Sequence, residues 1–170
     1  MASITQLLVA ELDREFPGTR RTLERVPEGR NDWKPHEKSM QLGYLAGLVA
    51  TMPAWMVSIL EEPSLDLAAP GRYRTGAFAS TAGLVAAFDA AAGEARAALL
   101  RATDEHLLAT TWKLLMNGRI LSEQNRYEAL RDGALNHLYH HRAQLTIYLR
   151  LNGRPVPGLY GPSADENNFG

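Results

Sequence analysis

Long helical periodicity dominates this chain and limits what it can fold into. Apolar residues recur at three- and four-residue steps over roughly residues 3–26, 40–60, 80–103 and 122–151, the spacing of one face of an α-helix. No segment alternates apolar and polar residues over a comparable length, as a half-buried strand would. Four long amphipathic helices predict an all-α fold, a four-helix bundle.

Two prolines lie inside these helical segments. Pro17, followed by Gly18, removes a backbone hydrogen bond to the carbonyl of Asp13, which predicts a kink in one continuous first helix. Pro53 predicts a second bend, in a helix for which Ser39 is the expected N-cap.

A small β-hairpin is predicted near residues 112–121. Asn117-Gly118 separates two short apolar runs there, and this dipeptide favours a type I′ turn. The linker from 61 to 79 is too long for a tight turn between antiparallel helices. It can cross the end of the bundle, so the helix order need not be up-down-up-down.

The last residues form a separate segment. Asn152 and Gly153 end the fourth helix, and residues 153–170 carry prolines and glycines without periodicity. We expect a bundle over 1–152 and a C-terminal tail over 153–170, which is either disordered or an extended strap docked on the bundle.

Composition and charge exclude several classes of function. With 170 residues, 45% of them hydrophobic, the chain fits one globular domain. Eighteen basic and nineteen acidic residues give a net charge of −1 without a basic run, so we expect no nucleic-acid partner. No apolar stretch reaches about 18 residues and the first residues do not resemble a signal peptide, which predicts a cytoplasmic protein without membrane contact. The absence of cysteine excludes disulfides, thiolate ligands and a catalytic thiol.

Two histidines, His137 and His141, are the strongest candidate for chemistry. Their i, i+4 spacing stacks both imidazoles on one face of a helix, within reach of a single zinc, nickel or iron ion. Both lie on the apolar stripe that contains Leu138 and Leu145. They form either a metal site or a packed pair in the core. His140 is an alternative second member, but His141 fits the stripe better.

Other possible metal ligands are scattered along the chain. No spacing singles out any of them; they are His36, His106, Glu11, Glu15, Asp165 and Glu166. Gln144, one turn after His141, could hold a water or a substrate oxygen. Nothing in the sequence identifies a catalytic residue, because it lacks both a Ser-His-Asp order and a pair of carboxylates suited to catalysis.

Three sequence blocks resemble the DinB (damage-inducible) family of bacterial four-helix proteins. They are WKPHEKSMQLGYLAGLVATMPAW from Trp33, HHRAQLTIYLRLNG from His140 and PVPGLYGPSADE from Pro155. The resemblance spans nearly the whole chain. It implies an up-down-down-up bundle, a homodimer, and a divalent metal, nickel or zinc, held by three histidines in a shallow cavity.

One position departs from the pattern of that family. Two of the three ligands implied by the resemblance match His137 and His141. The third should come from a leucine-x-x-histidine step that here reads Leu45-Ala46-Gly47-Leu48. Leu48 offers no lone pair, so the site either recruits water or a carboxylate as its third ligand or has lost the metal.

The resemblance therefore implies one of two functions. The first is a divalent-metal-dependent enzyme of the thiol-transferase or hydrolase type with an incomplete three-histidine site, acting on a small molecule or a low-molecular-weight thiol. The alternative is a non-catalytic, dimeric binding or stress-response module without metal. The two differ in whether the purified protein carries an ion.

Overall fold

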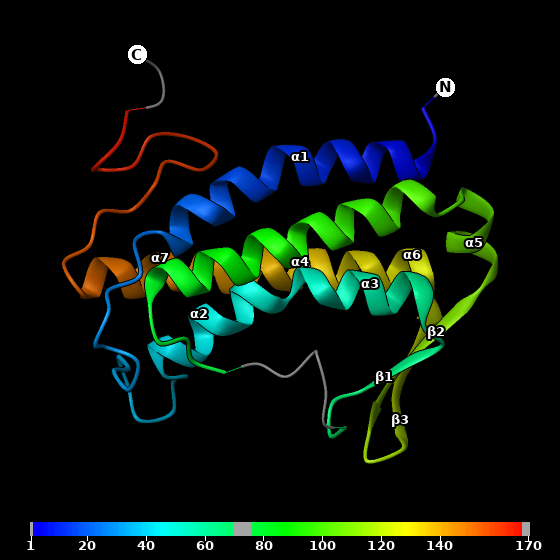
Figure 1. The fold of residues 1–170 in the computed structure, drawn as a ribbon, viewed down its shortest axis with the longest axis horizontal. Coiled ribbons are helices and arrows are strands. Elements are labelled where there is room, and N and C mark those ends of the chain that lie inside the picture. Colours follow the sequence, from blue (N-terminus) through cyan, green and yellow to red (C-terminus); the bar gives the residue numbers. More distant parts are fainter. Residues whose placement is uncertain (1, 70–75, 168–170) are drawn as a thin grey trace.

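The fold of the chain was analysed in a computed structural model that describes residues 2–69 and 76–167. Two long helices and a series of shorter ones account for most of these residues (Figure 1). The helices are α1 (Ile4–Leu23), α2 (Leu42–Thr51), α3 (Pro53–Glu61), α4 (Thr81–Arg101), α5 (Asp104–Ala109), α6 (Arg126–Glu128), the π-helix η1 (Ala129–Asn136) and α7 (His137–Leu151).

Four helical segments, α1, α2–α3, α4 and α6–α7, pack side by side. Their directions follow the up-down-down-up order implied by the resemblance. The first helix, α1, and the last, α6 to α7, run one way, whereas α2–α3 and α4 run the other way (Figure 1). Helix α4 packs against α1, α2 and α3, and α2 packs against α7. Leucines from every layer meet in one core, with Leu12, Leu45, Leu99 and Leu138 all buried.

The two helical prolines act differently. Helix α1 continues through Pro17 as one helix, as expected. Pro53 divides the second predicted helix into α2 and α3, which meet at an angle of 42°. The prediction of Ser39 as N-cap is wrong. Helix α2 begins after Gln41, which makes no side-chain cap, because the chain at 33–39 forms turns before it reaches α2.

The predicted hairpin is present and belongs to a larger sheet. Strands β2 (Thr111–Met116) and β3 (Arg119–Asn125) pair antiparallel around Asn117 and Gly118, whose φ angles of 52° and 75° suit a type I′ turn. Strand β1 (Ser64–Asp66), from the linker, pairs parallel with β2. The prediction of an all-α bundle with one small hairpin is corrected to a mostly helical fold with a three-stranded mixed sheet. Residues 70–75 of the linker lie outside the described part of the chain.

The fourth predicted helix differs most from its prediction. Residues 122–125 belong to β3, and the eight residues of η1 separate α6 from α7. A π-helix holds more residues per turn than an α-helix, so it shifts the face that the following helix presents. His137 begins α7 directly after this wider segment.

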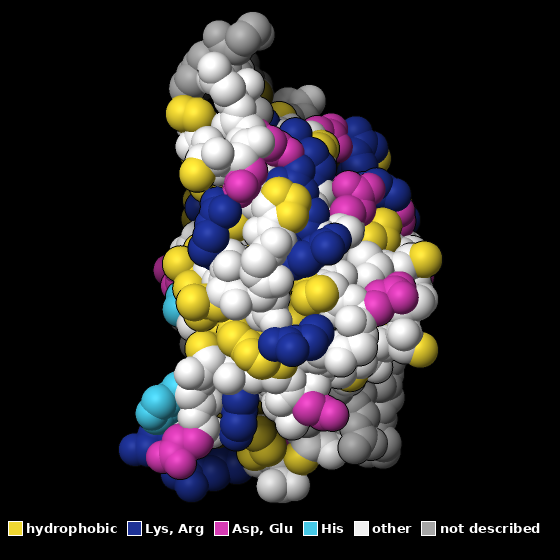
Figure 2. All heavy atoms as spheres, turned by 90° about the vertical axis from the view of Figure 1, so that its left-hand side faces the viewer, with side chains coloured by type: hydrophobic (Ala, Val, Ile, Leu, Met, Phe, Trp, Pro, Cys, Tyr) yellow, Lys and Arg dark blue, Asp and Glu magenta, His cyan; other side chains and the backbone are white. Residues whose placement is uncertain are grey.

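The tail packs as a strap up to residue 167, and residues 168–170 lie outside the described part. It runs beside the carboxyl-terminal half of α1 (Figure 1). Ion pairs fix it at both sides, from Arg25 to Glu166 and from Arg150 to Asp165. The end of the molecule near the tail carries basic and acidic side chains next to one another (Figure 2).

No single helix within the described residues is long and apolar enough to span a bilayer. Only the bent pair α2–α3 reaches that length and hydropathy when its two helices are taken together.

Candidate functional site

The two candidate histidines converge at the start of α7. The Nε2 atoms of His137 and His141 lie 2.8 Å apart, and their ring centroids are 4.5 Å apart. His141 is buried, with 5% of its surface exposed, and His137 is half-buried. The i, i+4 spacing on the apolar stripe of α7 therefore produces the pair that the sequence predicts.

The second nitrogen of each ring is also engaged. The Nδ1 atom of His141 lies 2.8 Å from Oε1 of Gln144, and His137 forms a hydrogen bond to the backbone of Gly133. Because Nε2 of His137 faces His141, the bond to Gly133 uses the opposite ring nitrogen. When both outer nitrogens donate, two lone pairs face each other at Nε2, and a cation between them relieves the repulsion. Gln144 thus orients a ring, a role that the sequence did not assign to it.

Burial keeps both rings in the form that binds metal. Desolvation lowers the pKa of His137 and of His141 from the usual 6.5, because the interior disfavours the charged imidazolium. The hydrogen bonds to Gly133 and Gln144 raise each pKa in part. Both histidines are therefore neutral at pH 7, and a neutral imidazole nitrogen is the metal ligand.

An indole forms one wall of the site. Trp55, from α3, meets the ring of His137 edge-on with centroids 5.9 Å apart. Its buried Nε1 has no hydrogen-bond partner among the described residues. A buried indole N–H is normally paired, so this donor is an exception within the described part of the chain.

No third protein ligand joins the pair. Among residues 2–69 and 76–167, no three His, Cys, Asp or Glu side chains are grouped to hold an ion. The carboxylates considered from the sequence all form ion pairs elsewhere: Glu11 with Arg131, Glu15 with Arg142, Asp165 with Arg150 and Glu166 with Arg25. Leu48 is buried in the core, on the helix that packs against α7.

The remaining histidines lie apart from this pair or at its edge. His36 accepts a hydrogen bond from the backbone of Lys38 in an exposed loop, and Nε2 of His106 lies 2.9 Å from the carbonyl of Leu60. His140 is exposed, with its ring centroid 5.0 Å from that of His141.

A buried arginine next to His141 was missed by sequence reasoning. Arg142 is 2% exposed, and its guanidinium donates to the Oε2 atom of Glu15 at 2.8 Å and to the hydroxyl of Thr19 at 3.0 Å. The hydroxyl of Tyr160 completes the cluster, donating to Glu15 at 2.7 Å. The only signal for it in the sequence is an arginine on the border of the apolar stripe, and arginine is seldom buried without a partner.

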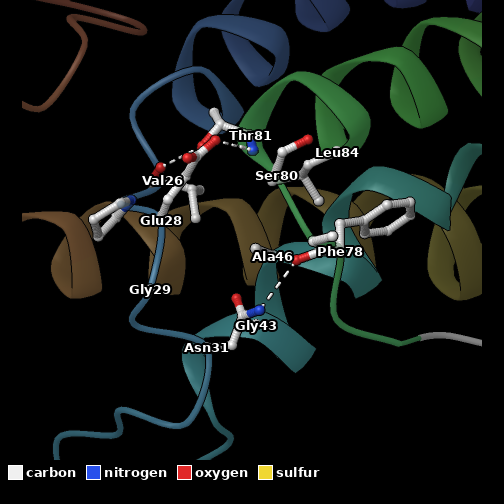
Figure 3. Close-up of a pocket in the computed structure, with 12 residues that line it drawn as sticks. Val26, Glu28, Gly29, Asn31, Gly43, Ala46, Phe78, Ser80, Thr81 and Leu84 are labelled. Atoms are coloured by element: carbon white, nitrogen blue, oxygen red, sulfur yellow. Dashed lines mark hydrogen bonds between the residues drawn. The ribbon is translucent and has the colours of Figure 1, made fainter.

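A small hollow beside α2 is filled by structural hydrogen bonds. About 20 Å³ remains where the loop at 26–31 and residues 78–81 meet α2 (Figure 3), enough for a water molecule. Its polar groups already pair, since Asn31 donates to the carbonyl of Phe78 at 3.0 Å and Glu28 accepts from the backbone of Thr81 at 2.9 Å. These bonds tie two loops together.

Comparisons with known proteins agree with the fold described above. A family model described as "DinB family" matches residues 1–168. A DinB-like protein from Bacillus cereus superposes with a TM-score of 0.68 at 20% identity, covering 93% of this chain and 98% of its own. One from Bacillus subtilis gives 0.65 at 18% identity, covering 90% and 97%. No curated protein matches the chain.

Proposed function

Because this chain belongs to the DinB family, we propose that it is a divalent-metal-dependent protein in which His137 and His141 are two ligands of one zinc or nickel ion. The observation that carries the proposal is the pair of Nε2 atoms 2.8 Å apart, each on a ring whose other nitrogen is engaged. Outer hydrogen bonds of this kind fix the orientation of metal-binding histidines in proteins.

The two rings fit an ion after a small adjustment. Two nitrogens bound to one tetrahedral zinc, each about 2.0–2.1 Å from it, lie about 3.3 Å apart. The rings would therefore separate by about 0.5 Å, which rotation of the side chains of His137 and His141 supplies. Two protein nitrogens leave the other positions to water or to a bound small molecule.

The surrounding residues suit a reaction on a small molecule. A divalent ion here would lower the pKa of a bound thiol or water, the chemistry of a thiol transferase or a hydrolase. Gln144 and Gly133 hold the rings, and the indole of Trp55 packs edge-on against His137. Because the described residues contribute no cysteine, the thiol would come from a low-molecular-weight substrate.

Metal content tests this proposal directly. We expect protein purified without a histidine tag and dialysed against zinc or nickel to retain close to one ion per chain. His137→Ala and His141→Ala should each lose most of it, because one imidazole alone binds weakly. His140→Ala is the matched control, since it removes an exposed histidine of the same run. Equal metal content in all four proteins would refute the site.

A gain of affinity gives the complementary test. Leu48 lies buried on α2, which packs against α7, at the position where the family pattern has its third ligand. We expect Leu48→His to raise zinc affinity at least tenfold, measured by competition with a chelating dye, because a third nitrogen completes the usual set. No gain would show that position 48 does not face the pair.

The alternative function is a binding module without metal. It is favoured by Leu48 and by the ability of the two rings to share a proton. If the amide of Gln144 turns so that it donates to Nδ1 of His141, then His141 can donate from Nε2 to His137. Wild-type protein that binds no zinc or nickel after dialysis would favour this alternative over a metal-dependent protein.

We also propose a homodimer. Ile147 and Leu151, one turn apart on α7, are 60% and 57% exposed, and His140 lies on the same helical face. Covering these side chains with a second copy would remove apolar surface from water.

A further inference from the structure

A pocket of about 440 Å³ lies between α1, α7 and the tail. Its volume falls within the range of small-molecule sites, about 300–1,000 Å³. Arg142 supplies the wall from α7, and Leu159 and Tyr160 supply the wall from the tail. None of these residues contributes to the histidine pair.

One face of α1 forms the floor of this pocket. Arg14, Pro17, Gly18 and Arg21 follow one another at i, i+3, i+4 and i+7, so they share a face of the helix. The missing side chain at Gly18 keeps the floor open. A Cβ atom there would lie 3.0 Å from the Cδ2 atom of Leu159, tighter than ordinary contact. The Pro-Gly interruption of the first helix thus lies between two arginines.

The charge of the lining is strongly positive. Three guanidinium groups and one carboxylate face the pocket, which leaves an excess of two positive charges. The carboxylate of Glu15 already accepts from Arg142 and from Tyr160. Arg21 donates to the carbonyl of Gly158 at 2.8 Å, and an uncharged carbonyl does not neutralise the guanidinium. Arg14 forms no ion pair with any residue in the described part of the chain.

Nearby acids offset the charge of these two arginines only in part. Glu166 lies close enough to Arg21 for that charge to lower its pKa. Its carboxylate nevertheless pairs with Arg25. The acids closest to Arg14 and Arg21 along α1 are also taken by other arginines: Asp13 by Arg96 and Glu24 by Arg20.

We propose that this pocket binds a small molecule carrying oxyanion groups, an organic phosphate or a polycarboxylate, through Arg14 and Arg21. The planar fork of a guanidinium matches the paired oxygens of carboxylate and phosphate. Arg142, held in place by Glu15 and Thr19, adds a buried guanidinium group to the wall of the pocket. This site is independent of the proposed metal.

Calorimetric titration with inorganic pyrophosphate and with tricarballylate tests this site and separates the two oxyanion classes; ribose serves as the uncharged probe. We expect at least one of the anions to bind saturably to the full chain and more weakly as salt is raised. Arg14→Ala should weaken that binding about tenfold, the usual effect of losing a charged hydrogen bond. Arg14 is exposed and forms no ion pair with a described residue, so its loss should leave the fold intact.

Two controls make the result decisive. Arg119→Ala removes the same charge from an exposed position on β3, outside the pocket, and should leave anion binding unchanged. The double variant His137→Ala with His141→Ala should still bind the anion, which separates this pocket from the metal site. Absence of saturable binding by both anions, or an equal loss in the two arginine variants, would overturn the proposal.

Discussion

At the scale of single residues, the sequence predicted some side chains of the site and not others. The pairing of His137 with His141 follows from helical spacing alone, since four residues nearly complete a turn. The roles of Gln144 and Trp55 do not follow from spacing. Gln144 acts through the rotamer it adopts towards His141, and Trp55 reaches the site only because α3 packs beside η1.

The histidine pair should make stability fall in mildly acidic solution. Both pKa values are lowered on folding from the usual 6.5, so the unfolded chain binds more protons than the native one below that pH. We expect the free energy of unfolding of the metal-free protein to be flat above pH 7. From about 6.5 towards the lowered pKa values it should decline, by up to about 1.4 kcal/mol per pH unit for each histidine.

Urea denaturation between pH 8 and pH 5.5 measures this decline. That range lies above the pH where most carboxylates titrate. The double variant His137→Gln with His141→Gln should lose the slope, and His140→Gln should retain it. A wild-type curve that stays flat to pH 5.5 would contradict the lowered pKa values.

At the scale of elements, local sequence signals predicted the helices and the turn. They did not predict the pairing of strands that lie far apart in the sequence. The four apolar stripes predicted the bundle, and Asn117-Gly118 predicted the hairpin. Strand β1 was missed because three residues carry no readable alternation and their partner lies in β2, far along the chain. Asp66 strengthens that contact by accepting from the backbone of Asn117 and Gly118 at 3.0 and 2.7 Å.

Two glycine substitutions should change stability in opposite directions. Gly118 has a φ of 75°, so Gly118→Ala places a Cβ in the left-handed region and should cost about 1 kcal/mol. Gly93 is exposed within α4 and a Cβ there meets nothing within 4 Å. Gly93→Ala should therefore stabilise by about 0.5–1 kcal/mol. Thermal and urea unfolding measure both. A stabilising Gly118→Ala would contradict the left-handed turn, and a destabilising Gly93→Ala would contradict the open position on α4.

At the scale of the whole molecule, the strap joins the first and last helices through Arg25 and Arg150. The sequence left open whether this tail was disordered or docked. Docking of the tail depends on ion pairs between distant residues, such as Arg25 and Glu166. A local sequence pattern does not predict such pairs.

Association of two chains is expected at the same scale. We expect light scattering at micromolar concentration to give twice the mass of one 18.8 kDa chain. Ile147→Lys together with Leu151→Lys should shift the protein to monomer, because charges would replace exposed apolar side chains on α7. The same two changes at Ile120 and Leu121, which are similarly exposed on β3, provide the control. A monomeric wild type would rule out the dimer.

The π-helical segment at 129–136 has a consequence for how this molecule can vary. Each residue of an α-helix turns the chain by about 100°. Winding the same eight residues as an ordinary α-helix would rotate every later side chain around the helix axis, so that a different stripe would face the interior. Substitutions that switch these eight positions between the two windings would therefore change which side chains the last helix turns inward, without altering any residue that performs the chemistry.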